Sequence, residues 1–207
     1  MLKVWGHAAS SNVMKVLWLL DEVGLEYERV DAGGRFGGTD TPEYREKQPL
    51  GLIPVLEEDG FALFESNAIL RYLCNAHVPA SSIYPHEPRS RGRVDAWLDF
   101  QQTALVRPQS VVFLGLVRQT PEQRDATAIS AALTEAGRIW GIVDRRLAAH
   151  PYLTGTAFTI ADIAFGVHVH RWFSMSIARP DSPNLRAWYE HLLSRPAYQR
   201  HCAVPLT

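Results

Sequence analysis

The 207-residue sequence has little cysteine, no excess of charge of either sign and no long apolar run. Its two cysteines, Cys74 and Cys202, can build neither a disulfide framework nor a cysteine-rich zinc site. With 21 basic and 22 acidic residues the formal net charge is −1, so no overall positive field attracts nucleic acid or anionic lipid. The longest apolar runs, such as residues 16–20, fall far short of the roughly 20 residues that a membrane-spanning helix needs.

These absences predict a soluble, cytoplasmic protein without a nucleic-acid or membrane partner, since the first residues also contain no apolar stretch of the secretory kind. The sequence does contain enough apolar residues to form a hydrophobic core. Hydrophobic residues make up 46% of the chain and six of them are tryptophans, which favours a folded globular protein and excludes a disordered or fibrous one.

Residues 1–77 alternate between strand and helix signals. Short β-rich runs occupy residues 2–5, 27–31, 54–57 and 61–64. Helical spacing begins at Val13, a short helix with Pro42 at its first position follows the glycine-rich loop, and a third helix begins at Ser66. The predicted order is β-α-β-α-β-β-α. We expect the first two strands to be parallel, because a helix joins them, and the last two to form an antiparallel hairpin.

After residue 77 the pattern changes to helices only. A proline-rich linker over residues 78–88 precedes helical spacing that continues to the C-terminus. Pro108 is expected to kink or end the first long helix, and the second is expected to be continuous from about Pro121 to Leu147. The fold class predicted is therefore an α+β domain over residues 1–77 followed by an all-α domain over residues 89–207.

The first β-to-α turn, residues 7–12, is rich in polar side chains. A helix start offers free N–H groups and the positive end of the helix dipole, so it favours an anion such as a thiolate. No cysteine lies in this turn, so a thiolate there must come from a ligand. Ser10 and Asn12 are also ordinary helix-capping residues, and that reading stays open beside the functional one.

Two further segments have the composition of a peptide-binding site. Pro54 follows Ile53 at a strand start, which fits a cis peptide bond that leaves the Ile53 N–H and C=O free to pair with an extended ligand. Glu65 and Ser66 begin the third helix, where a carboxylate can bind the N–H groups and the hydroxyl while Glu65 accepts an ammonium. An ordinary cap with an acidic first turn is the alternative.

Residues 10–15, 51–54, 65–70 and 159–164 together resemble the cytosolic glutathione transferase family, in the order and spacing of that family. The likeness covers essentially the whole chain and is greatest to bacterial members related to the theta and nu classes. It implies a thioredoxin-like N-terminal domain, a helical C-terminal domain, glutathione as co-substrate, no metal and a homodimer.

The resemblance assigns parts of glutathione to particular residues. Glu65 and Ser66 would hold the α-amino and α-carboxylate groups of the γ-glutamyl unit, and the Ile53 backbone before cis-Pro54 would pair with the cysteinyl backbone. Many relatives carry a basic residue directly before the Ile/Val-Pro pair for the glycyl carboxylate, but this chain has Leu52 there.

Ser10 would donate a hydrogen bond to the thiolate, with Asn12 beside it and Ser11 as the helix cap. Such a bond lowers the pKa of a thiol from about 8.5 towards neutrality. Whether Ser10, Ser11 or Asn12 contacts the sulfur stays open at this stage.

Other candidates are less specific. Arg35 and Thr39 are alternatives for binding the glycyl carboxylate. Arg107, Phe113 and Trp172 are candidates for an apolar pocket that takes the second substrate, and Trp172 is equally compatible with the core.

Two patterns in the helical region have structural explanations. Thr159 and Asp162 form an acidic capping box, whose expected role is in folding. His168 and His170 are two positions apart, so they point to different helix faces and do not favour a metal site.

The function predicted is conjugation of glutathione to a small apolar electrophile. Glutathione-dependent disulfide reduction is the alternative within the same fold, in which Asn12 would matter more than Ser10. A non-catalytic binding protein is the alternative from another class.

Overall fold

The computed structural model describes residues 1–206. Its sheet contains β1 (Leu2–Trp5), β2 (Tyr27–Val30), β3 (Val55–Glu58) and β4 (Phe61–Phe64), in the order β2-β1-β3-β4. β1 is parallel to β2 and antiparallel to β3, and β3 is antiparallel to β4. The predicted order of elements and the predicted strand directions are confirmed.

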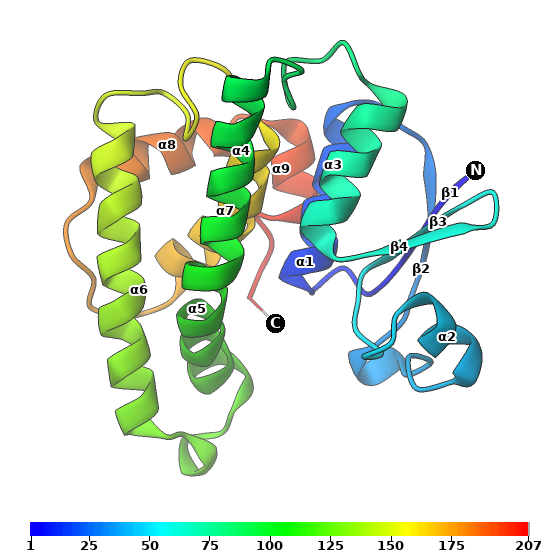
Figure 1. Cartoon of the computed structure of the whole chain (residues 1–207). Coiled ribbons are helices and arrows are strands. Elements are labelled where there is room, and N and C mark those ends of the chain that lie inside the picture. The colour runs from blue at the N-terminus through cyan, green and yellow to red at the C-terminus, as the bar shows by residue number, and fades with distance from the viewer. Residues whose placement is uncertain (207) are drawn as a thin grey trace.

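Alternation along the strands divides the sheet into two faces. Val4 and Leu56 belong to the main core with α1 (Ser11–Glu22) and α3 (Ser66–His77). Their neighbours Trp5 and Val55 pack instead with Tyr44 of α2 (Pro42–Lys47). Figure 1 shows α1 and α3 between the sheet and the other helices, with α2 on the far side.

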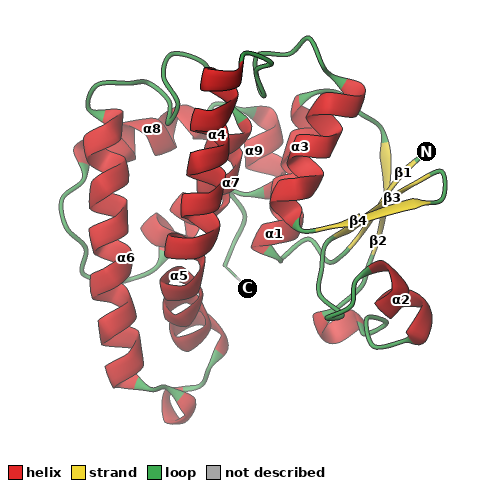
Figure 2. Ribbon diagram, viewed as in Figure 1, coloured by secondary structure: helices red, strands yellow, loops and turns green. Residues whose placement is uncertain are grey.

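The rest of the chain is helical (Figure 2). The helices are α4 (Pro88–Phe100), α5 (Val106–Phe113), α6 (Ala126–Leu147), α7 (Ile160–Ser174), α8 (Pro183–Leu193) and α9 (Pro196–His201). Residues 160–169 of α7 are all buried, so this helix forms the centre of the helical part. Among the residues described, no helix is both long and apolar enough to cross a membrane.

One hydrophobic core joins the two parts of the molecule. It extends from Val4 of the sheet through Trp18 of α1 to Phe165 of α7. Residues 78–87 contain neither helix nor strand, as expected of a linker. The boundaries at residues 77 and 89 separate the α/β part from the all-helical part. That these parts are independent domains remains a prediction, because the hydrophobic core crosses both boundaries.

Two predictions about helix ends were wrong. Pro108 does not end a helix at its own position, since it is the third residue of α5, which follows a π-helical turn at Gln101–Leu105. In a π turn each carbonyl accepts a hydrogen bond from the N–H five residues later instead of four. The hydrogen-bond pattern has therefore already changed before Pro108, and the missing N–H of proline does not interrupt a regular α-helical pattern. The next helix begins at Ala126, because Asp125 caps it and accepts a hydrogen bond from the Ala128 N–H at 2.9 Å.

The capping box at the start of α7 is confirmed. Asp162 accepts hydrogen bonds from the N–H groups of Thr159 (2.9 Å) and Leu153 (3.0 Å) and from the Trp188 indole (3.2 Å). Complete burial raises the pKa of Asp162 to about 6, although these hydrogen bonds act in the opposite direction. Asp162 thus connects α7, α8 and the loop before them, which is a role in folding.

Candidate functional site

Ser10 lies at the N-terminus of α1 in an extended conformation, with φ −81° and ψ 124°, and occupies the N-cap position. Its hydroxyl makes no capping hydrogen bond, so it is available to a ligand. Ser11, expected to be the cap, is the first residue of the helix itself. The correction follows from the backbone, because the helical hydrogen bonds begin with Met14 N–H donating to the Ser10 carbonyl at 2.8 Å.

The Ile53-Pro54 peptide bond is cis, as the sequence suggested. Within residues 1–206, neither backbone polar group of Ile53 has a hydrogen-bond partner. Both groups of its neighbour Leu52 do, since its N–H donates to Gln48 (3.1 Å) and its C=O accepts from the Tyr44 hydroxyl (2.9 Å). The loop is therefore held by Leu52 and leaves the Ile53 backbone open.

Glycine brings this loop against the first turn. A Cβ at Gly6 would lie 2.5 Å from Val13 and 3.2 Å from the Ile53 side chain, and the φ of +146° at Gly6 also disfavours other residues. Gly33 contacts Ile53 from a third segment, because a Cβ there would lie 3.2 Å from it. The site thus depends on close backbone approach at two glycines.

The start of α3 carries the third group of predicted residues. Glu65 has a φ of 69°, which is uncommon outside glycine, and its exposed side chain makes no capping bond. The buried Ser66 hydroxyl donates a hydrogen bond to Asn12 Oδ1 at 3.2 Å. The first turn and the start of α3, 54 positions apart in sequence, are therefore directly connected.

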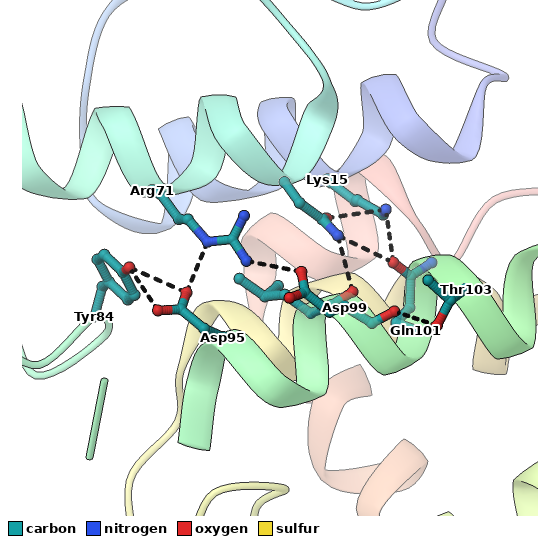
Figure 3. A network of polar contacts seen from close by, with 9 residues as sticks. Lys15, Arg71, Tyr84, Asp95, Asp99, Gln101 and Thr103 are labelled. Carbon is teal, nitrogen blue, oxygen red and sulfur yellow. Dashed lines mark hydrogen bonds and ion pairs between the residues drawn. The ribbon is translucent and has the colours of Figure 1, made fainter. Parts of the chain in front are cut away.

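Sequence reasoning missed Lys15, which holds these segments together from inside. Its side chain is fully buried, and its ammonium donates to Ser66 Oγ (3.3 Å), Asn67 Oδ1 (3.2 Å) and Gln101 Oε1 (3.0 Å). Figure 3 shows Lys15 facing Gln101 between helices. Burial lowers the pKa of Lys15 to about 7, and the nearby Glu65 carboxylate partly opposes this effect. The feature of the sequence that could have identified Lys15 is its position among the apolar residues of α1 that are buried on both sides of it.

The polar network continues into the helical region. Gln101 also contacts His168 Nε2 at 3.0 Å, and burial, followed by the charge of Lys15, holds the pKa of His168 well below its usual value. His170 lies in a different environment, between the Tyr189 hydroxyl (2.9 Å) and the Val204 carbonyl (2.8 Å). The two histidines therefore face different partners, as their spacing predicted.

An ion cluster fixes α4 against α3 beside Lys15 (Figure 3). Arg71 donates to Asp95 at 2.7 Å and to Asp99 at 3.1 Å, and the Tyr84 hydroxyl donates to Asp95 at 3.1 Å. These bonds help to set the position of Gln101, because it follows α4 directly.

A cavity of about 350 Å³ adjoins the first turn at Ala8 and Ala9. It is lined by Ala8, Ala9, Met14, Phe113, His170, Arg171, Arg200, His201, Cys202, Val204, Pro205 and Leu206. Hereafter it is called the tail cavity, since the last residues described form one of its walls.

Of the three residues expected in a second-substrate pocket, Phe113 lines the tail cavity and two do not. Trp172 is buried in the core, with its ring centroid 6.3 Å from that of Trp140. Arg107 is exposed on α5. Successive helical residues point about 100° apart. Arg171 therefore takes the cavity-facing place that the sequence suggested for Trp172.

A second cavity, of about 510 Å³, adjoins the same turn, and its wall contains three arginines and one aspartate. It is lined by His7, Ala8, Ala9, Arg29, Asp31, Gly34, Arg35, Phe36 and Arg118. Arg35, one of the two candidates for the glycyl carboxylate, lies here with its guanidinium 4.8 Å from the Phe36 ring centroid. Thr39 is not part of its wall.

Comparison with known proteins gives a consistent result. Residues 1–75 match the family model for the glutathione S-transferase N-terminal domain, and residues 126–191 match that for the C-terminal domain. The chain is 34% identical over 209 residues to glutathione S-transferase GstB of Escherichia coli K12, with complete coverage of both chains.

Solved structures agree with this. A theta-class glutathione S-transferase from Xanthomonas axonopodis pv. citri with glutathione bound is 42% identical, with a TM-score of 0.95 and coverage of 100% of this chain and 99% of that one. A glutathione S-transferase from Pseudomonas fluorescens is 32% identical, with a TM-score of 0.86 and coverage of 99% and 98%.

Proposed function

The chain belongs to the glutathione S-transferase family and is a glutathione transferase, and we propose that it joins the sulfur of glutathione to an electrophilic carbon of a small molecule. The observation that carries the proposal is the convergence of three polar groups at one turn, two of which are open. These are the uncapped Ser10 hydroxyl, the unpaired Ile53 backbone and the Ser66 hydroxyl bonded to Asn12.

Glutathione fits these groups in an extended conformation. Glu65 binds the γ-glutamyl ammonium. The N–H groups at the start of α3 bind the α-carboxylate, to which the Ser66 hydroxyl redirects the hydrogen that it gives to Asn12 in the free protein. The Ile53 N–H and C=O pair with the cysteinyl unit as an added strand would. Arg35 takes the glycyl carboxylate, because the apolar Leu52 cannot.

In the reaction, Ser10 donates its hydroxyl hydrogen to the thiolate. This bond, together with the positive end of the α1 dipole, lowers the pKa of the bound thiol, so more nucleophile is present at neutral pH. The sulfur lone pair forms the new bond to carbon, the leaving group departs with its bonding electrons, and the thiol proton passes to solvent.

The choice between conjugation and disulfide reduction depends on Asn12. Its Oδ1 accepts the Ser66 hydrogen bond, which turns this side chain towards the γ-glutamyl subsite. Ser10 has no such partner within the residues described. This difference favours Ser10 as the residue that contacts sulfur, and thus conjugation as the reaction.

The tail cavity is the place for the electrophile, since Met14, Phe113 and Leu206 give it an apolar wall beside the first turn. We expect a role in detoxification in the cytoplasm, in line with this chemistry. Activity screening across aryl halides, epoxides, enones and mixed disulfides would identify the reactive group.

A homodimer is part of the proposal. β4 is an edge strand whose residues Phe61 and Phe64 are 46% and 38% exposed, and α4 carries a shallow apolar depression that includes Trp97 and Phe100. Two copies can bury these patches together. Light scattering should give twice the chain mass, and Phe64→Asp should shift the protein towards monomer; a monomeric parent protein would contradict this part.

Calorimetric titration with glutathione tests the binding assignments. The parent protein should bind, and Ser66→Ala should weaken the affinity about tenfold, as expected for a lost hydrogen bond to a charged group. Ser130→Ala, at an exposed position on α6, is the matched control and should bind unchanged. Absence of binding at millimolar glutathione would contradict the proposed function, and an unaffected Ser66→Ala variant would remove the γ-glutamyl assignment.

A further inference from the structure

The tail cavity has a positive charge that nothing in its wall neutralises. Its twelve lining residues include two arginines and two histidines but neither aspartate nor glutamate. Two of these basic residues are turned to Asp21 outside the wall, because Arg200 pairs with it and His201 contacts it at 2.8 Å. His170 is bonded to Tyr189 and Val204.

Arg171 is the remaining cation. Its guanidinium lies 4.1 Å from the Phe113 ring centroid and donates one hydrogen bond, to the Ala9 carbonyl at 2.8 Å. Within residues 1–206 it has no carboxylate partner. Arg118 lies near the same ring at 5.6 Å, so the surroundings of Arg171 add positive charge rather than compensate it.

Such an arrangement is unfavourable in an empty protein. Burial and the charge of Arg118 lower the pKa of Arg171 to about 10, yet the group stays protonated at neutral pH. Charges withdrawn from water are ordinarily paired, and the half-buried, unpaired Arg171 in this cavity wall points to a ligand that brings the opposite charge. Four of the five N–H hydrogens of Arg171 remain to bind it.

We propose that the tail cavity selects electrophiles that carry a carboxylate, and that Arg171 is the residue that binds this carboxylate. The inference rests on the proposed function, since it names the substrate class of the same site. The guanidinium fork matches the two oxygens of a carboxylate. Arg171 is anchored on the carbonyl directly before Ser10, so a small molecule held there stays beside the thiolate.

An aryl halide with a ring carboxylate meets these requirements. Its ring can pack on Phe113 and Met14 while the carboxylate binds Arg171. With 4-chloro-3-nitrobenzoate, a C–S bond forms at the ring carbon, the C–Cl bond breaks, chloride leaves with the bonding pair and the thiol proton passes to solvent. No further reactant is needed.

The test compares two glutathione conjugates that differ in one group, S-(4-carboxy-2-nitrophenyl)glutathione and its carboxamide counterpart, with S-methylglutathione as the reference. Calorimetry should show the carboxylate conjugate binding the parent protein at least about tenfold more tightly than the amide, as one charge-assisted pair allows. Arg171→Gln should bring this ratio close to one. Arg171→Lys, which keeps the charge and loses the fork, should give an intermediate ratio.

Arg107→Gln, an exposed arginine of the same helical region, is the matched control and should keep the parent ratio. Equal binding of both conjugates to the parent protein would overturn the inference, as would a full carboxylate preference in both Arg171 variants. An equal loss of S-methylglutathione affinity in Arg171→Gln would also overturn it, because Arg171 would then serve glutathione itself. Failure of the parent protein to bind S-methylglutathione would instead contradict the proposed function.

Discussion

Each side of the first turn contains a cation withdrawn from solvent, fully buried in the case of Lys15 and half-buried in the case of Arg171, but the protein satisfies the two differently. Lys15, on the side of α3, donates to three neutral oxygens from Ser66, Asn67 and Gln101. Arg171, on the side of the tail cavity, has one carbonyl and the face of one ring. Neither cation has a carboxylate partner within residues 1–206.

This difference matches the ligands that the two sides are proposed to take. Protonated Lys15 has three ammonium hydrogens, and all three are used before any ligand arrives. The γ-glutamyl subsite is therefore set in advance for one constant ligand, which saves the entropy of ordering it on binding. Arg171 keeps most of its donors, so the electrophile subsite selects by charge and leaves the rest of the substrate free to vary.

Ser10 stands where the two sides meet, and its removal should have the largest effect. Ser10→Ala should raise the pKa of bound glutathione by about one unit or more and lower kcat/KM about a hundredfold, since one preorganised donor to a developing or resident anion is lost. Thiolate absorbance measured against pH reports the pKa, and initial rates with an aryl halide report the turnover.

Ser11→Ala is the control for Ser10→Ala, because Ser11 is a helical residue one position on. It should leave the thiol pKa unchanged. An unchanged pKa in Ser10→Ala together with a raised one in Asn12→Ala would reassign the sulfur contact and favour disulfide reduction.

Lys15→Met should have the next largest effect, and it should change glutathione binding without changing the selection of the electrophile. Loss of the shared donor releases Ser66, so glutathione affinity should fall about tenfold. The ratio between the carboxylate and carboxamide conjugates should not change. Stability should fall by about 1–3 kcal/mol, because the buried Asn67 Oδ1 loses the donor that Lys15 supplies. Calorimetry and urea unfolding measure these three quantities.

Lys47→Met is the matched control for Lys15→Met, since Lys47 pairs with Glu57 at 2.8 Å on the far side of the sheet. It should bind glutathione like the parent protein. A Lys15→Met protein with undiminished glutathione affinity would show that Lys15 fills space without positioning Ser66.

Glutathione binding should also change the protonation of Lys15. With a pKa of about 7 the side chain is mostly neutral at pH 8 in the free protein. A bound α-carboxylate favours the ammonium and raises this pKa, so binding should take up a fraction of a proton. The other groups that face Lys15 are the neutral Ser66, Asn67 and Gln101, the Glu65 carboxylate and, through Gln101, His168, whose lowered pKa keeps it neutral at pH 8.

S-Methylglutathione is the ligand for this measurement, because it has no thiol proton to release. Titrations at pH 8 in two buffers of different ionisation enthalpy give the number of protons exchanged. Uptake in the parent protein and none in Lys15→Met is the expected result; proton release, or equal uptake in both, would contradict it.

Local chemistry explains how much of the site the sequence could predict. The turn before α1, the Ile53-Pro54 step and the start of α3 are each encoded by neighbouring residues, so their positions follow from capping and proline rules. Lys15 is different, because its partners Asn67 and Gln101 are 52 and 86 positions away. The role of Lys15 depends on hydrogen-bond partners that only tertiary packing brings next to it. No rule based on neighbouring residues in the sequence can identify such a lysine.

The same limit applies in the helical region. Apart from the start of α6, the periodicity gave the helices. Whether position 171 or 172 faces the cavity depends on how α7 rotates against its neighbours, and one position changes the direction by about 100°. Pro108 is a second example. Its known cost in a helix predicted an interruption there, while the π turn before it shifts the hydrogen bonds and lets the helix proceed.

The smallest expected effect tests whether the two sides are independent. Lys15 and Arg171 share no hydrogen-bond partner, since one bonds to Ser66, Asn67 and Gln101 and the other to Ala9. Their free-energy losses for the carboxylate conjugate should therefore add within about 0.5 kcal/mol in the double variant Lys15→Met/Arg171→Gln. Lys15→Met/Ser66→Ala should lose much less than the sum, because both changes remove one interaction. Equal non-additivity in the two pairs would mean that a single network spans the first turn and that charge selection and glutathione binding cannot be tuned separately.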